Sequence, residues 1–321
     1  MTVTRRTALA VLAAVAAAAP ARTAERPLVA VTAIVEHPAL DATRDGVKEG
    51  LAAEGFVDGE TITFQFESAQ GSPATAVQIA RRFVGEAPAV IVPISTPSAQ
   101  AVAAATRDIP VVFSSVTDPV GAKLVPDRAH PGGNVTGMSN MSPIDKHLDL
   151  VAEVVPGLKT LGVIHNPAEI NSRTLVGMVE AQAPARGIAI VEAPVSKSSD
   201  VQAAAQSLVG RVDAVYVPTD NTVVSAFEAL AQVGRENRLP VIAGDIDSVA
   251  RGAIAAVGFD YLDVGRQTGR MVARVLRGEK PGDIPVEQAQ TLELAVNPAA
   301  AAAMGVSLPE TLVARADIVV R

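Results

Sequence analysis

Apolar and polar positions alternate along this chain in blocks of two kinds. Residues 28–35 form a continuous apolar run, which is typical of a strand buried on both faces of a sheet. Residues 41–54 then carry apolar positions at helical spacing, and this pattern ends at Gly55. The same order continues, with strands predicted at 61–67, 89–94 and 109–114 and helices predicted at 73–85 and 97–106. Such alternation predicts βαβ units and a parallel sheet.

The pattern breaks in the middle of the chain and then restarts. Residues 127–140 are rich in Gly, Pro, Asn and His without a helical period, so we expect an irregular segment there. Beyond it we predict helices at 146–155, 172–186, 201–209, 223–237 and 263–277, and strands at 160–165, 188–193, 214–218, 240–243, 253–259 and 291–296. The chain therefore predicts an α/β fold of two similar, doubly wound parallel-sheet lobes joined near residues 138–143.

The end of the chain supplies one more helix and strand than the second lobe needs. We expect the chain to cross back near Gly258 and again near Glu287, which makes a hinge of about three segments. The N-terminal lobe is then 27–140 plus about 259–287, and the C-terminal lobe is 141–258 plus about 288–321. Alternatively, the tail stays wholly with the second lobe.

Composition narrows the class of protein. The 321 residues suggest about two domains, and 49% of them are hydrophobic while only 3% are aromatic, so the cores must be aliphatic. The formal net charge of -7, without a cluster of Lys or Arg, argues against a nucleic-acid partner. The absence of Cys excludes disulfides, thiolate metal sites, a Cys nucleophile and a lipid anchor on Cys. The four His residues lack metal-ligand spacing, so we predict no metal and no cofactor.

The N-terminus has the features of an export signal. Residues 4–7 contain two arginines, an apolar run follows from Ala8 to Ala19, and small residues at 19–21 suit cleavage. We predict a cleaved signal peptide at 1–24 and export to the periplasm by the twin-arginine route. A membrane anchor is the alternative, but the run is shorter than the roughly 20 residues that span a bilayer.

Polar residues follow almost every predicted strand. Ligands of open parallel sheets bind beyond the carboxyl ends of the strands, where helix N-termini present free N–H groups. The candidates are Glu36, Ser95, Thr96, Ser98, Thr117 and Asp118 in the first lobe, and Asn171, Thr219, Asp220, Asn221 and Asp245 in the second. Helix capping explains any single one of them. Their clustering favours a site, and their mixture of hydroxyls, amides and carboxylates suits a zwitterion.

Longer stretches resemble a known family. Residues 35–41, 110–120, 131–139, 216–225 and 258–269 are similar to those of the ABC transporter substrate-binding family that includes tryptophan- and tyrosine-binding members. The resemblance covers essentially the whole mature chain. It implies a type I periplasmic binding-protein fold, a ligand between the lobes and delivery to ABC permease subunits. The ligand that it implies is an amino acid, with aromatic amino acids among the candidates. Two departures from the usual pattern are Pro167 and Asn140, and we include Asn140, which replaces a frequent Asp, among the ligand-binding candidates.

Particular roles follow as hypotheses. Ser95, Thr96 and Ser98 are expected to donate to an anionic group. Asp118 or Asp220 is expected to pair with an ammonium or hydroxyl group, and we expect Asp220→Ala to weaken binding at least about tenfold. Asn171 and Asn221 are expected to donate from the second lobe on closure. The aromatics near strand ends, Phe113, Tyr216, Phe259 and Tyr261, either pack in the core or stack on an aromatic ligand.

A binder is favoured over an enzyme. The chain has no Gly-x-Ser-x-Gly elbow and no Cys, although a carboxylate pair across the lobes stays open. A sugar or nucleoside binder of the same fold, and a sensory binding protein, remain alternatives. A DNA-binding regulator of this fold is rejected because a signal occupies the N-terminus. We expect a monomer, since each lobe must move freely against the other.

Overall fold

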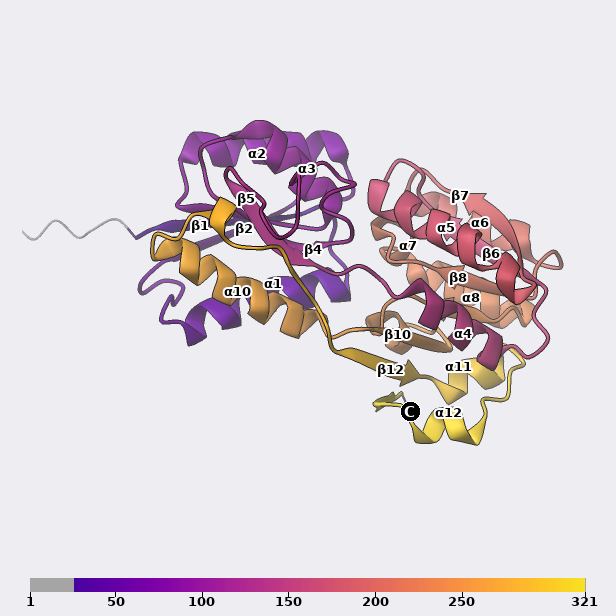
Figure 1. Cartoon of the computed structure of the whole chain (residues 1–321). Coiled ribbons are helices and arrows are strands. Elements are labelled where there is room, and N and C mark those ends of the chain that lie inside the picture. The colour runs from indigo at the N-terminus through magenta and orange to yellow at the C-terminus, as the bar shows by residue number, and fades with distance from the viewer. Residues whose placement is uncertain (1–25, 321) are drawn as a thin grey trace, which may run out of the picture.

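The computed structural model describes residues 26–320 and arranges them as two α/β lobes that lie side by side (Figure 1). Each lobe has its own sheet, and together the two sheets confirm the predicted fold class. The signal peptide predicted at 1–24 lies outside the described residues. Within residues 26–320, no helix has both the length and the apolar character needed to cross a membrane.

The N-terminal lobe is built on a six-stranded parallel sheet in the order β11-β5-β4-β3-β1-β2. Helices α2 and α3 cover one face of the sheet, and α1 and α10 cover the other (Figure 1). Strands β3 and β4 are buried along their whole length because both faces are covered. The elements are β1 (Leu28–Ala33), α1 (Pro38–Ala53), β2 (Thr63–Ser68), α2 (Pro73–Glu86), β3 (Val90–Ile94), α3 (Thr96–Ala105), β4 (Val111–Val116), β5 (Val135–Ser139), α10 (Tyr261–Leu276) and β11 (Glu287–Gln288).

The C-terminal lobe is built on a seven-stranded sheet in the order β13-β12-β10-β9-β8-β6-β7. All of its pairs are parallel except β10 with β12, which is antiparallel. Its elements are α4 (Ile144–Val154), β6 (Thr160–His165), α5 (Ile170–Gln182), β7 (Ala189–Pro194), α6 (Val201–Leu208), β8 (Ala214–Val217), α7 (Asn221–Val224), α8 (Phe227–Asn237), β9 (Val241–Ala243), α9 (Asp247–Ala250), β10 (Ala255–Phe259), β12 (Leu292–Val296), α11 (Pro298–Ala303), α12 (Glu310–Ala314) and β13 (Ile318–Val319). Short 3₁₀ turns lie at Pro184–Arg186, Ser198–Asp200 and Pro281–Asp283.

Three segments carry the chain between the lobes. The first runs from β5 to α4, the second from β10 to α10, and the third from β11 to β12 (Figure 1). The tail therefore does not stay wholly with the second lobe, because β11 pairs with β5 in the first sheet. These crossings support our proposed lobes, 27–140 plus about 259–287 and 141–258 plus about 288–321, with β11 extending the returning segment to Gln288.

The returning helix α10 is held against α1 by glycines on both helices. A side chain at Gly265 would overlap the backbone at Thr43, and one at Gly46 would overlap the backbone at Leu262. The two helices therefore approach more closely than residues with a Cβ would allow. Asp260 starts α10, because its carboxylate accepts hydrogen bonds from the amides of the first turn. The second crossing is thus anchored firmly to the N-terminal lobe.

Two local predictions were wrong. Residues 135–139 form strand β5 inside the segment expected to be irregular, and Gly137 is required there because a side chain would overlap Phe113 of the neighbouring strand. Gly137 within the strand, and Gly132, Gly133 and Asn134 directly before it, hid the strand pattern. The helix predicted at 223–237 is two helices, α7 and α8, separated at residues 225–226. The short elements α9, α11, α12, β11 and β13 were also not foreseen.

Candidate ligand-binding site

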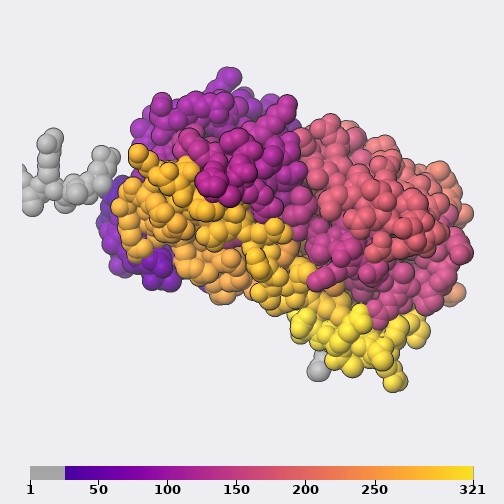
Figure 2. Space-filling model, viewed as in Figure 1, coloured from indigo at the N-terminus to yellow at the C-terminus, as the bar shows by residue number. Residues whose placement is uncertain are grey.

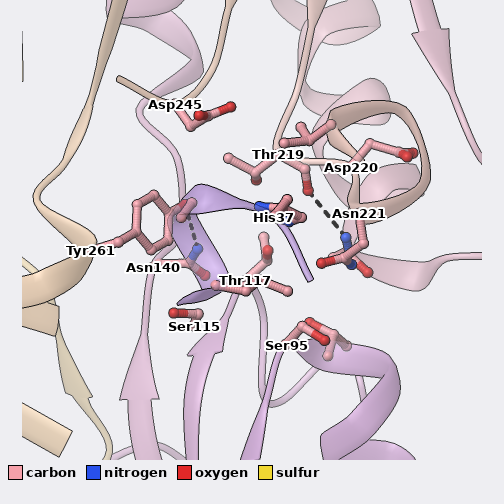
Figure 3. Close-up of a pocket in the computed structure, with 15 residues that line it drawn as sticks. His37, Ser95, Ser115, Thr117, Asn140, Thr219, Asp220, Asn221, Asp245 and Tyr261 are labelled. Carbon is pink, nitrogen blue, oxygen red and sulfur yellow. Dashed lines mark hydrogen bonds between the residues drawn. The ribbon is translucent and has the colours of Figure 1, made fainter. Parts of the chain in front are cut away.

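A small cavity of about 30 Å³ lies where the strand ends of the two lobes face each other (Figure 3). The lobes abut along this boundary in the space-filling view (Figure 2). The lining consists of His37, Ala39, Leu40, Ser95, Thr96, Ser115 and Thr117 from the N-terminal lobe, Asn140 and Tyr261 from the crossing segments, and Asn171, Thr219, Asp220, Asn221, Val224 and Asp245 from the C-terminal lobe.

The N-terminal wall is centred on the start of helix α3. The hydroxyl groups of Ser95 and Thr96 are buried, and neither has a hydrogen-bond partner among residues 26–320. They lie at the N-terminus of a ten-residue helix, where unpaired backbone amides and the helix dipole favour negative charge. This wall therefore offers hydrogen-bond donors and a positive potential to an anionic group.

Two serines of the N-terminal wall have backbone conformations that side chains rarely adopt. The φ angle is 78° at Ser95 and 54° at Ser115. Backbone strain of this kind costs about 1–3 kcal/mol per residue and concentrates at binding sites. The Oγ atom of Ser115 lies 3.1 Å from Oγ1 of Thr43, so helix α1 fixes its direction. The backbone conformations of Ser95 and Ser115 therefore lower local stability while they shape the N-terminal wall.

The C-terminal wall is centred on two asparagines, Asn171 at the start of α5 and Asn221 at the start of α7. The side-chain amide of Asn171 donates to Oε2 of Glu169 at 3.2 Å and to the carbonyl oxygen of Thr219 at 3.2 Å. Both N–H groups of that amide are thus engaged within the lobe. Its Oδ1 atom is buried and has no partner in the described part of the chain. This wall therefore offers a free hydrogen-bond acceptor.

The two aspartates of the C-terminal wall are already hydrogen-bonded to protein groups. Oδ2 of Asp220 accepts from the backbone amide of Asn166 at 2.5 Å and from Oγ of Ser172 at 2.6 Å, while Oδ1 accepts from the amide of Val223 at 2.8 Å. Burial and the nearby carboxylate of Glu169 raise the pKa of Asp220 to about 7.

Asp245 accepts from the amide and the hydroxyl of Ser248 at 2.9 and 2.8 Å. Burial raises the pKa of Asp245 above its usual range. Each carboxylate oxygen has two lone pairs, so Asp245 retains room for a ligand donor.

The crossing segments close one side of the cavity. Nδ2 of Asn140, on the first crossing, donates to the hydroxyl of Tyr261, on the second crossing, at 3.0 Å (Figure 3). Oδ1 of Asn140 and Nδ1 of His37 are buried without partners within residues 26–320. Burial, and to a lesser extent the charge of Arg251, lower the pKa of His37 to about 3, so its imidazole is neutral at physiological pH.

The structure brings nine of the twelve predicted site residues to this cavity, and the other three lie elsewhere. Glu36 is exposed and accepts from Nε2 of Gln70 at 2.8 Å. Asp118 accepts from the amide of Gly121 at 2.9 Å and so stabilises a turn. Ser98 is buried within α3, outside the cavity lining.

The predicted site set left out several lining residues, notably His37 and Ser115. Both lie just after predicted strands, which is the signal that could have included them. Tyr261 was one of four aromatics considered, and it is the only one of them in the lining. Phe113 and Tyr216 are fully buried in the cores, where the hydroxyl of Tyr216 lies 2.6 Å from Nδ1 of His147. Within residues 26–320, no group of three His, Asp or Glu side chains suits a metal ion.

A larger, more open cavity of about 510 Å³ adjoins the first one, and the side chain of Asn221 lines both. Apolar side chains on its N-terminal side include Val35, Pro97 and Ala101. Its C-terminal side is polar and includes Glu169. We call this the outer cavity and the smaller one the inner cavity.

Comparison with known proteins places the chain in a family. Residues 28–320 match the family model of the ABC transporter substrate binding protein. The chain is 42% identical to a tyrosine-binding protein of Clostridioides difficile over 84% of this chain and 78% of that protein. An ABC domain from Streptococcus pneumonia in complex with L-Trp has a TM-score of 0.89 at 32% identity, covering 92% of this chain and 100% of that one.

A third comparison is with a structure described as open and ligand-free. The ligand-free, open structure of a Clostridium difficile substrate-binding protein with adhesive properties has a TM-score of 0.69 at 39% identity, covering 92% of this chain and 99% of that one. This chain therefore superposes better on the L-Trp complex than on the open, ligand-free structure, although its sequence is more similar to the latter.

Proposed function

Because the chain belongs to the ABC transporter substrate-binding protein family, we propose that it captures an amino acid between its lobes and delivers it to the permease of an ABC importer. The observation that carries the proposal is the division of the inner cavity into two unlike walls. Unpartnered hydroxyls and a helix N-terminus face from one lobe, and an unpartnered amide oxygen faces from the other. A zwitterion satisfies both.

The ligand's carboxylate would lie against Ser95 and Thr96, where donors and the helix dipole stabilise an anion. Its ammonium would lie against Oδ1 of Asn171, with the carboxyl group of Asp245 also in the lining. This placement differs from the sequence-based hypothesis, which gave the ammonium to Asp118 or Asp220. Asp118 is not in the lining, and the carboxylate of Asp220 is occupied by three protein donors.

We propose an aromatic amino acid as the first candidate. Support comes from the relative named for tyrosine and from the neighbour solved with L-Trp. Tyr261 is an aromatic wall for a ring to stack against. The inner cavity is smaller than an aromatic side chain, and the outer cavity, with apolar Val35, Pro97 and Ala101, provides the adjoining space for a bulky group.

The remaining proposals concern the setting in which the protein acts. Substrate-binding proteins of ABC transporters act outside the cytoplasm, and we propose the periplasm, reached by a twin-arginine signal, as the compartment. The partners would be the small-molecule ligand and the membrane subunits of the permease. We propose that the protein is a monomer without enzymatic activity, because two lobes must rotate freely to open and close the cavity.

The test is a thermal-shift screen followed by calorimetry on the purified protein. The panel contains free amino acids, aromatic analogues, sugars and nucleosides. A ligand that binds only the folded state stabilises it by about 2.7 kcal/mol at a hundredfold excess over Kd, which is measurable. Stabilisation by tyrosine, tryptophan or another amino acid supports the proposal. Stabilisation by sugars or nucleosides alone would overturn the amino-acid assignment while keeping the closing clamp.

A further inference from the structure

We propose that Glu169 is a positioning residue that orients the side-chain amides of Asn171 and Asn221 and so makes the C-terminal wall accept hydrogen bonds rather than donate them. The inference deepens the proposed function and rests on it, because it explains how one wall selects the ammonium group of an amino acid. Glu169 itself lines the outer cavity and not the inner one, so it acts through the two asparagines.

Glu169 is 8% exposed, and protein donors surround its carboxylate. Oε2 accepts from Nδ2 of Asn171 at 3.2 Å, from Nδ2 of Asn221 at 2.5 Å and from the backbone amide of Asn221 at 3.3 Å. Oε1 accepts from the backbone amide and the hydroxyl of Thr222 at 3.1 and 2.7 Å. One buried carboxylate therefore collects five donors, two of which are the amides of the wall.

The hydrogen-bonding chemistry of carboxylates and amides allows only one orientation of the asparagine side chains beside Glu169. An ionised carboxylate only accepts hydrogen bonds, so each asparagine must turn its NH₂ group toward Glu169. The second N–H of Asn171 is taken by the carbonyl oxygen of Thr219. Oδ1 of Asn171 is left buried and unpartnered within the described residues, and Asn171 lines the inner cavity. If this amide were turned over, the wall would present N–H donors and repel an ammonium.

A purely local role for Glu169 does not account for this arrangement. Glu169 precedes helix α5, yet its side chain makes no capping hydrogen bond to that helix. It reaches instead to the start of α7, where Asn221 and Thr222 lie 52 and 53 residues further along the chain. A glutamine of the same shape would offer its own N–H groups and would no longer enforce one orientation.

The experiment compares Glu169→Gln with the wild type and with the control Glu180→Gln, which changes an exposed glutamate on the same helix α5. Calorimetry measures the affinities for L-tyrosine and for N-acetyl-L-tyrosine, which lacks the ammonium. The preference for the free amino acid should fall at least about tenfold in Glu169→Gln and stay unchanged in Glu180→Gln. A preserved preference in Glu169→Gln would overturn the proposal. A simple loss of stability would lower both affinities together and leave the preference unchanged.

A rescue variant guards against a misfolded single variant. In the double variant Glu169→Gln with Asn171→Asp, the amide at position 169 donates to a carboxylate at position 171, which again presents an acceptor to the ligand. The preference for L-tyrosine should return toward the wild-type value. A double variant that folds, as judged by circular dichroism, and binds both compounds alike would contradict the positioning role.

A ligand-free measurement separates this proposal from the proposed function. The ¹H–¹⁵N signals of the two asparagine side chains, assigned with Asn171→Ala and Asn221→Ala, should shift in Glu169→Gln and not in Glu180→Gln. Unshifted signals would refute the positioning role even if the wild type binds amino acids. Shifted signals in a protein that binds no amino acid would support the positioning role and overturn the proposed function alone.

Discussion

The two walls of the inner cavity differ in the hydrogen-bonding groups that they leave free. On the N-terminal wall, Ser95 and Thr96 present hydroxyls that nothing within residues 26–320 satisfies, at the positive end of a helix. At the C-terminal wall, the carboxylate of Asp220 accepts from three protein donors, and the carboxylate of Glu169, behind the wall, accepts from five, so both hold other groups in place. The first wall leaves donors free, and the second leaves an acceptor free.

This difference links binding to closure. A ligand with one charge satisfies only one wall and leaves the other buried and unpartnered, which costs free energy. A zwitterion satisfies both walls at once, and only when the lobes have closed. The closed arrangement is therefore favoured by the ligand that carries both charges, which is what a population shift requires.

The largest expected effect comes from removing one charge of the ligand. Tyramine lacks the carboxylate and tests the N-terminal wall, while N-acetyl-L-tyrosine lacks the ammonium and tests the C-terminal wall. Each should bind at least about 100-fold more weakly than L-tyrosine, because a buried partner is left unpaired. Competition calorimetry measures both. If either analogue bound as tightly as L-tyrosine, the corresponding wall would not discriminate between ligands by their charge.

The next effect comes from removing the free acceptor. Asn171→Leu keeps the volume of the side chain but loses Oδ1, so L-tyrosine should bind about 30-fold more weakly, since hydrogen bonds to charged groups contribute about 1.5–3 kcal/mol. Asn237→Leu, at an exposed position of α8, is the control and should bind normally. Affinity unchanged in Asn171→Leu would remove Asn171 from the site.

A smaller effect is expected at the strained serine of the N-terminal wall. Ser95→Ala removes the hydroxyl and keeps the strain, whereas Ser95→Gly removes both. Both should weaken binding by about tenfold, from the loss of one hydrogen bond to a charged group. Ser95→Gly should be more stable than Ser95→Ala by about 1 kcal/mol in denaturant unfolding. Weakened binding in only one of the two would mean that backbone shape, not the hydroxyl, matters.

The outer cavity allows a test of ligand size. Ala101→Phe fills part of this cavity from helix α3 and should lower the affinity for tyrosine and tryptophan by about fivefold. Alanine and serine, if they bind, should be unaffected because they do not leave the inner cavity. An equal loss for small and aromatic ligands would place the aromatic side chain elsewhere.

The smallest effect is expected from pH. Because the pKa of His37 is lowered to about 3, its imidazole stays neutral, so the wild type and His37→Gln should show the same pH dependence of the affinity for L-tyrosine between pH 6.5 and 5.5. Asp220, whose pKa is raised to about 7, titrates in both proteins. Stability behaves differently. Below pH 6.5 the unfolded chain takes up a proton that the folded chain refuses, so the contribution of His37 to the free energy of unfolding is lost as pH falls toward 3. Replacement by Gln should flatten that part of the stability profile.

Much of the site was predictable because parallel strands bring their carboxyl ends to one edge. That rule identified Ser95, Thr96 and Asn171 from sequence position alone. It does not specify side-chain direction, so Glu36 was chosen although its neighbour His37 faces the cavity. Asp220 shows a second limit, because two of its three donors, the amide of Asn166 and the hydroxyl of Ser172, lie 54 and 48 residues away in the chain and only the fold reveals them.

The fold was predictable wherever periodicity was strong. The strands at 160–165 and 28–33 lie within the predicted ranges because their apolar runs are continuous. Strand β5 was missed because its close approach to Phe113 requires Gly137, and glycine weakens the strand pattern. The returning helix α10 was predicted as a helix from its periodicity, while its close packing on α1 depends on pairs of glycines whose partners lie more than 200 residues apart in the chain.

The most direct test of the central claim is a crystal structure of the protein with L-tyrosine or L-tryptophan bound. The account predicts closed lobes, with the ligand carboxylate within hydrogen-bond distance of Ser95 and Thr96 and the ammonium beside Oδ1 of Asn171. A ligand bound in the reverse orientation, or held by one lobe alone, would contradict the division of the cavity into a donor wall and an acceptor wall.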